Sequence, residues 1–292
     1  QAARAAAASV LARSLPHASF PSPHPALYPP APDGHPIVSK PIRPGGADPS
    51  SSDYRRSHLA SGKGESYHAM FSENSYRRTL WGLEKRILDR ILGEDLGHRE
   101  IHHLDFACGT GRVLAHVAAR ARVSVGVDIS PSMLAVAKSG SGRSEIYEAD
   151  LTTDDILGAR EFNLITAFRF FPNAQPSLRD DAMRVLVRHL GPDGRLVFNN
   201  HRNMSSVKYR LARLRGRGGR EGMSLAEVRE LVSRNGLRIA RSYAMGFTLD
   251  GDEHMFTPKV LLPPLEGALS KCPLIKRFGE NMVFVCRRAA GD

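Results

Sequence analysis

The stretch that decides the fold is IHHLDFACGTGRV, residues 101–113. A short apolar run ends at Asp105, a loop of small residues follows, and a helical pattern begins after Gly111. Small residues let the backbone approach a ligand closely, and the first turn of a helix offers unpaired N–H groups. This order of strand, acid, small-residue loop and helix predicts a nucleotide-type binding site at the end of a strand.

Two further strand-like runs also end in an acid. VSVGVD ends at Asp128, and EIYEAD ends at Asp150. A carboxylate at the second strand end can accept hydrogen bonds from a ribose diol, and one at the third can accept a bond from an exocyclic amine. The structural alternative is that these acids cap helices or solvate loops.

Strand and helix patterns alternate along the rest of the chain. Apolar helical spacing covers 75–92, and further helical patterns cover 111–121, 130–138, 177–190 and 224–236. Ser177 with Asp180, and Ser224 with Glu227, occupy capping-box positions. Strands are expected at 101–106, 123–128, 145–150, 162–168, 195–200, 237–243 and 282–288. The alternation predicts an α/β fold with a mostly parallel sheet and helices on both of its faces.

The N-terminal region has a different composition. Eleven of the 19 prolines lie between Pro16 and Pro49, so residues 1–60 are predicted to be a disordered, proline-rich tail. The first 15 residues contain arginine and no acid, which is typical of organelle-targeting segments; the alternative is a tail without targeting value. Order is expected to begin near Tyr67.

Charge and cysteine content bound the class of protein. The net charge is +11, which suits nucleic acid, an acidic lipid surface or a phosphorylated substrate, although an arginine-rich proteome gives the same count. Cys108, Cys272 and Cys286 show no metal-ligand spacing, and no metal site is predicted. So few cysteines suit a reducing compartment, and we expect a cytoplasmic protein. No apolar run is long enough to cross a bilayer.

Four stretches together resemble a known family. HLDFACGTGRV (103–113), VGVDISPSMLAVAK (125–138), EIYEADLT (145–152) and VLVRHLGPDGRLVF (185–198) are similar to the signatures of class I S-adenosylmethionine-dependent methyltransferases. The resemblance covers residues 101–243. It implies a seven-stranded sheet with an antiparallel last strand at 282–288.

The resemblance also implies domain limits and a methyl donor. Residues 61–292 would form the methyltransferase domain, with an N-terminal helical cap at 61–98, a basic segment at 204–222 and a substrate-cap insertion at 248–280, here called the cap. S-adenosylmethionine is the implied cofactor. NAD is disfavoured because its fingerprint places a third glycine where this chain has Leu114.

The implied cofactor-binding residues follow the family pattern. Asp105 would hold the amino group, Asp128 the ribose hydroxyls, and Asp150 with Leu151 the adenine edge. The full set is Asp105, Ala107, Cys108, Gly109, Thr110, Gly111, Asp128, Ile129, Met133, Asp150, Leu151 and Phe168. Ala107 stands where many members have glycine, and we expect its φ to be negative.

The acceptor should lie at the ends of the fourth and fifth strands. Arg169 suits an anionic acceptor through paired hydrogen bonds, and a structural ion pair is the alternative. His201 is the candidate general base, because an imidazole titrates near neutrality. Tyr67 and His68 are candidates to close over the site. The Asn/Asp-Pro-Pro-aromatic motif of enzymes that methylate amino groups is missing from 168–173.

These features favour methyl transfer to a small-molecule or lipid-like acceptor, at oxygen. Two other interpretations stay open. One is a non-catalytic assembly or regulatory protein with this fold, and the other is an RNA methyltransferase, which only the charge suggests. The basic segment has one aromatic residue, Tyr209, so support for nucleic-acid binding is weak.

Overall fold

The computed structural model describes residues 54–55, 71, 73–97, 99–216, 222–252 and 254–289. The predicted tail up to residue 53 lies outside these ranges, as do Tyr67 and His68. Within the described part, the strands and helices follow the predicted alternation closely.

A seven-stranded sheet forms the centre of the fold, with strand order β3-β2-β1-β4-β5-β7-β6. All strand pairs are parallel except those of β7, which runs antiparallel to both β5 and β6. The predicted α/β class and antiparallel last strand are therefore confirmed. The strands are β1 (His102–Phe106), β2 (Val123–Asp128), β3 (Glu145–Glu148), β4 (Phe162–Ala167), β5 (Leu190–Asn200), β6 (Leu237–Met245) and β7 (Asn281–Arg288).

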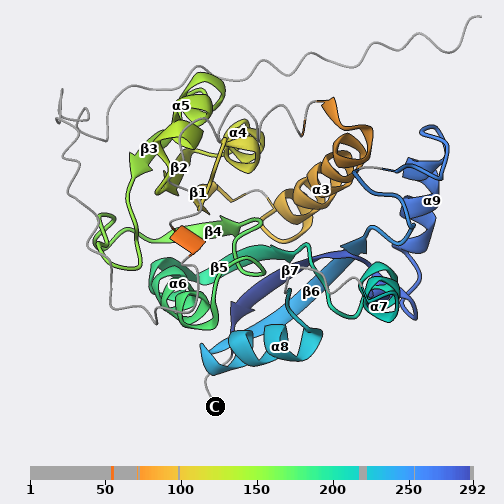
Figure 1. Ribbon diagram of the computed structural model, residues 1–292. Coiled ribbons are helices and arrows are strands. Elements are labelled where there is room, and N and C mark those ends of the chain that lie inside the picture. Colours follow the sequence, from red (N-terminus) through yellow and green to blue (C-terminus); the bar gives the residue numbers. More distant parts are fainter. Residues whose placement is uncertain are drawn as a thin grey trace, which may run out of the picture. The chain divides into compact units, whose positions relative to one another are not determined.

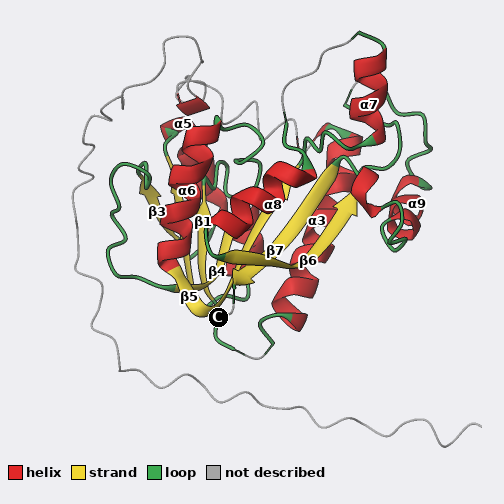
Figure 2. Cartoon of the chain, turned by 90° about the horizontal axis from the view of Figure 1, so that it is seen from below, coloured by secondary structure: helices red, strands yellow, loops and turns green. Residues whose placement is uncertain are grey.

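Helices cover both faces of the sheet. Figure 1 shows α3 (Ser75–Glu94), α4 (Arg112–Ala118) and α5 (Pro131–Gly140) on one face. Figure 2 shows α6 (Pro176–His189) and α8 (Leu225–Arg234) across the other. Buried side chains of β7 alternate between the two layers: Phe284 packs with the α6 and α8 cluster, whereas Val283 and Val285 pack with the α3 and α4 cluster.

Local sequence signals explain most helix ends. The Ser224–Glu227 capping box of α8 forms as predicted, with both reciprocal bonds present. The predicted box at Ser177 and Asp180 is wrong, because α6 begins one residue earlier with Pro176 in its first turn and Gln175 as N-cap. Proline suits that position, since its missing N–H is unpaired there in any helix.

The segment between β5 and α8 carries α7 (Val207–Leu214), and the cap carries α9 (Leu262–Leu269) and the short η1 (Lys276–Phe278). The buried carboxylate of Glu266 on α9 accepts hydrogen bonds from the backbone N–H groups of Gly246, Phe247 and Thr248. This carboxylate anchors the cap to the end of β6. No helix in the described part of the chain is long and apolar enough to span a membrane.

Candidate active site

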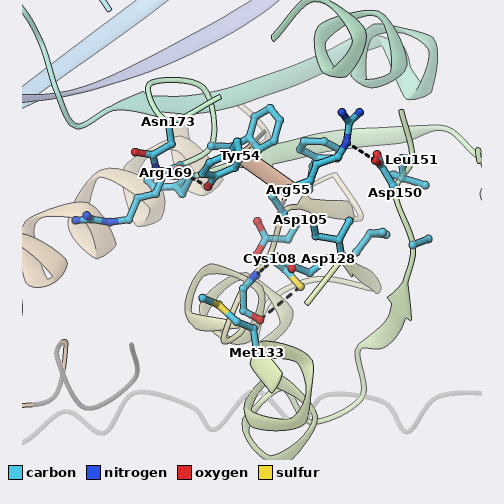
Figure 3. A pocket seen from close by; sticks show the side chains of 18 of the residues that line it. Tyr54, Arg55, Asp105, Cys108, Asp128, Met133, Asp150, Leu151, Arg169 and Asn173 are labelled. Carbon is cyan, nitrogen blue, oxygen red and sulfur yellow. Dashed lines mark hydrogen bonds and ion pairs between the residues drawn. The ribbon is translucent and has the colours of Figure 1, made fainter. Parts of the chain in front are cut away.

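A pocket opens at the carboxyl ends of β1, β2 and β4, where parallel α/β sheets bind their ligands. It encloses about 990 Å³ of empty space, measured out to its open mouth. Every predicted cofactor-binding residue lines it except Gly111, and so does Arg169. Figure 3 shows the acids Asp105, Asp128 and Asp150 around this space.

Asp105 is the most buried acid of the pocket. Its Oδ1 accepts a hydrogen bond from Thr166 Oγ1 at 2.6 Å, whereas its buried Oδ2 has no hydrogen-bond partner among the described residues. Burial raises the pKa of Asp105 to about 7, and the nearby Asp128 charge acts in the same direction. A buried carboxylate oxygen without a partner is costly, so it points to a cationic ligand.

A chain of hydrogen bonds runs beneath Asp105 through the sheet. His103 Nε2 lies 2.8 Å from Thr166 Oγ1, and His103 Nδ1 lies 3.0 Å from Ser124 Oγ. Burial lowers the pKa of His103 to about 3, so the ring is neutral. Because Thr166 gives its only proton to ionised Asp105, His103 must donate from Nε2 and accept from Ser124 at Nδ1. This chain fixes the orientation of the Asp105 carboxylate.

Asp128 connects two loops at the end of β2. Its Oδ2 accepts from the Gly109 N–H at 2.8 Å, and its Oδ1 accepts from the Ser130 N–H at 2.9 Å. The same residue therefore holds the glycine loop in place and lines the pocket.

Asp150 is engaged by a residue far away in the sequence. Arg55 Nε donates to its Oδ2 at 2.6 Å, and Arg55 Nη2 donates to Thr152 Oγ1 at 2.7 Å. Thr152 N–H donates to the other carboxylate oxygen, Oδ1. A ligand amine at this position would thus share Asp150 with Arg55.

Ala107 corrects one expectation. Its φ is +53°, in the left-handed region, whereas we expected a negative value. The turn after β1 requires this geometry so that Cys108 N–H can donate to the Val127 carbonyl at 3.1 Å and bring the loop onto β2. An alanine there is strained, which is why glycine suits the position.

Ala107→Gly is expected to raise the free energy of unfolding by about 0.5–1 kcal/mol, because relief of this strain exceeds the entropy that glycine adds to the unfolded chain. Urea denaturation measures the change. The control is Ala135→Gly, at an exposed position on α5, which should lower stability by about 1 kcal/mol. If both substitutions lower the free energy of unfolding equally, the backbone at residue 107 is not strained.

Gly111 has a structural role. Its φ is +76° at the start of α4, and a Cβ there would lie 2.6 Å from Ser141 Oγ. The position therefore needs glycine for both conformation and space. Ile129, Met133 and Leu151 are among the apolar residues that line the pocket.

Arg169, just after β4, also has a left-handed backbone, with φ at +62°. Its N–H donates to Asn199 Oδ1 at 2.6 Å, and its carbonyl accepts from the side chains of Asn173 and Tyr54. Asn199 is in turn within hydrogen-bond reach of Glu84 and Asn281 in the core. Three side chains thus hold a conformation that arginine seldom adopts, and such strain is concentrated at functional sites.

The Arg169 guanidinium makes no ion pair with a described residue, and its buried Nε has no hydrogen-bond partner among them. Its Cζ lies 4.7 Å from the centre of the Phe71 ring, and Arg112 Cζ lies 3.5 Å from the same centre. The structural ion pair considered for Arg169 is therefore not formed within the described chain. The same pocket thus contains three acids together with Arg169.

His201 follows β5 but does not line the pocket. Burial, and then the charges of Arg169, Arg202 and Arg77, move the pKa of His201 well below its usual value. A low pKa keeps the imidazole neutral but makes it a weak base. Its role as general base stays a prediction that this geometry does not favour.

Sequence reasoning missed Tyr54 and Arg55, which it assigned to the tail. Tyr54 packs edge-on against Phe170 with ring centres 5.7 Å apart, and its N–H donates to Gln175 Oε1 at 3.3 Å. Figure 3 shows the pair between Arg169 and Asp150. The DYRRSH stretch, free of proline after Pro49, was the only signal available.

Among the described residues, no group of His, Cys, Asp and Glu could hold a metal ion.

Comparison with known proteins agrees with this geometry. Residues 104–194 match the family model described as a methyltransferase domain. No curated protein matches the chain. Among solved structures, magnesium protoporphyrin IX methyltransferase from Synechocystis PCC 6803 with bound SAH has a TM-score of 0.59 at 14% identity, covering 80% of this chain and 98% of that one.

Two other solved structures have the same fold. The N-methyltransferase NodS from Bradyrhizobium japonicum WM9 has a TM-score of 0.53 at 16% identity, over 82% of this chain and 100% of that one. A putative methyltransferase in complex with the Haloferax volcanii Trm112 activator gives 0.54 at 17% identity, with coverage of 82% and 100%. The sheet order and the match of residues 104–194 show that the chain contains a methyltransferase domain with the Rossmann-like fold of the class I methyltransferases.

Proposed function

We propose that the chain transfers a methyl group from S-adenosylmethionine to an oxygen of a small-molecule or lipid-like acceptor. The observation that supports this most directly is the buried, partnerless Oδ2 of Asp105 in a pocket that also presents Asp128 and Asp150. The cofactor carries an ammonium group, a ribose diol and an adenine amine. Each of these groups donates hydrogen bonds that one of the three carboxylates could accept.

The residues of the pocket fit this cofactor part by part. Asp105 would bind the ammonium group, and the carboxylate of Asp128 would accept hydrogen bonds from the ribose hydroxyls. Ile129, Met133 and Leu151 would contact the adenine ring, with its amine beside Asp150. When bound, the cofactor supplies a methyl group already activated on a sulfonium, so the protein mainly has to align the acceptor.

Arg169 is our candidate for binding the acceptor. A locked backbone and a guanidinium without an acidic partner in the described chain suit a carboxylate or phosphate group of the acceptor. Phe168 and Asn173 line the same end of the pocket. Arg169 would hold the anionic group while the acceptor oxygen faces the cofactor.

Arg169→Gln is expected to leave the affinity for S-adenosylmethionine within about twofold but to abolish stabilisation of the cofactor-loaded protein by millimolar inorganic phosphate or acetate. Thermal unfolding at constant ionic strength measures this effect, and exposed Arg184→Gln is the matched control. If cofactor affinity falls more than about tenfold instead, Arg169 binds the carboxylate of the cofactor and not the acceptor.

The proposed function itself has two separate tests. Calorimetry with S-adenosylmethionine should give a dissociation constant in the micromolar range, the scale of metabolite sites. Incubation of the protein with a labelled methyl donor and extracts of metabolites, lipids or RNA should label the first two only. Binding without any labelled product would favour the non-catalytic interpretation, and labelled RNA would favour the RNA methyltransferase.

A further inference from the structure

Exposed apolar side chains are concentrated in two neighbouring segments. Of ten large apolar residues that are exposed in the described part of the chain, two lie on α7, at Val207 and Leu214. Six others lie in the cap: Leu249, Phe256, Val260, Leu261, Leu265 and Leu274. Val260 and Leu274 are each more than 80% exposed. Single exposed apolar residues are ordinary, but eight in two adjacent segments indicate an interaction surface.

The cap and α7 are joined to each other and to the sheet. Lys208 on α7 donates to Glu280 at 2.7 Å, and the Arg210 guanidinium lies 5.5 Å from the centre of the Phe278 ring. Glu266 ties α9 to the residues after β6. Figure 1 shows α7 and α9 beyond the same end of β6. That end is the carboxyl edge of the parallel strands, where the pocket also opens.

The charge around these apolar residues is positive. The described acids of the cap are all engaged internally: Asp250 and Glu266 accept backbone N–H groups, Asp252 pairs with Arg77, and Glu280 pairs with Lys208. Exposed cations that make no ion pair with a described residue are Lys259, Lys271, Arg277, Arg210, Arg213 and Arg215. The surface therefore combines aliphatic and aromatic side chains with free positive charge.

We propose that the cap and α7 form a docking surface for an anionic lipid bilayer. Aliphatic side chains insert into the interface between headgroups and acyl chains, and lysine and arginine attract anionic headgroups. Nucleic acid would use the cations but would leave these leucines and valines unburied. Docking would turn the pocket mouth toward the lipid headgroups. This inference rests on the exposed residues and charges, and holds whether or not the domain transfers methyl groups.

The test is flotation of the full chain with vesicles. The protein should bind vesicles of phosphatidylcholine mixed with phosphatidylglycerol, and pure phosphatidylcholine vesicles should bind much less. Phe256→Ser, Val260→Ser and Leu274→Ser in one chain should weaken binding at least about tenfold, as should Lys259→Gln, Lys271→Gln and Arg277→Gln in another. All six positions are exposed, so the fold should not change.

Matched controls lie at the opposite edge of the sheet. Ile156→Ser removes an exposed apolar residue there, and Lys138→Gln with Arg143→Gln removes two exposed cations from α5 and the loop after it. These variants should float like the unmodified protein. Absence of flotation with anionic vesicles, or equal losses in controls and cap variants, would overturn the proposal. A dimer in light scattering that the serine variant dissociates, without vesicle binding, would assign the surface to a second copy of the chain.

Discussion

Asp105→Asn is expected to stabilise the free protein above pH 7 while it abolishes cofactor binding. The carboxyl group has a pKa of about 7 in the folded protein, against 3.8 in the unfolded chain. A raised pKa means that its contribution to stability is complete below about pH 4 and is lost as the pH rises through about 7. At pH 8.5 the ionised group is buried, and the nearby Arg112 charge only partly offsets the cost of that burial, which is about 2–4 kcal/mol. Asparagine removes that charge and keeps an oxygen for Thr166.

Urea denaturation at pH 6 and pH 8.5 measures the first effect, and calorimetry with S-adenosylmethionine measures the second. The stability difference between variant and parent should grow with pH, because only the parent carries the titrating group. Asp193→Asn, at an exposed position of β5, should change neither quantity. If the difference in free energy of unfolding between Asp105→Asn and the parent is the same at pH 6 and pH 8.5, the buried Asp105 carboxyl does not ionise between these pH values in the free protein.

Asp128→Ala is expected to weaken S-adenosylmethionine binding by at least about 100-fold. Two hydrogen bonds to a charged acceptor are lost, each worth about 1.5–3 kcal/mol. The variant should also lose stability, because the Gly109 and Ser130 N–H groups lose their acceptor. Calorimetry and urea denaturation measure the two effects separately.

A cofactor analogue without the 2′-hydroxyl separates ribose recognition from support of the loop. If Asp128 binds the diol, the analogue should bind the unmodified protein more weakly, and Asp128→Ala should cost the analogue less than it costs the natural cofactor. Equal costs for the two ligands would mean that Asp128 acts only by holding the glycine loop.

Local sequence patterns predicted the fold and many of the residues that line the pocket. Alternating strands and helices have short-range signals in periodicity and capping, and the carboxyl ends of parallel strands must meet at one edge. Asp105, Asp128 and Asp150 were therefore placed together by topology alone. The ring of His103 was not noticed, because its role depends on Ser124 and Thr166 on the two neighbouring strands.

Long-range contacts and backbone conformation were harder to predict. Arg55 and Asp150 are 95 positions apart, and nothing in the composition of the N-terminal region marks that pairing. Positive φ at Ala107 and Arg169 also went unpredicted, since both residue types normally avoid it. His201 is the predicted general base because of its residue type and its place after a strand. Neither feature indicates that the side chain is buried near three arginines, which lower its pKa.

The two-residue contact of Tyr54 and Arg55 has a consequence for the order of events. Arg55 contacts Asp150, at the proposed adenine end of the pocket, and Tyr54 contacts the Arg169 carbonyl, at the proposed acceptor end. If an incoming adenine amine displaced Arg55, its neighbour Tyr54 would also move. The hydrogen bond from Tyr54 to the Arg169 carbonyl would then change, and with it the backbone conformation that orients the Arg169 side chain. Under the proposed function, this coupling predicts a sequential kinetic scheme in which the donor enters first and the demethylated cofactor leaves last.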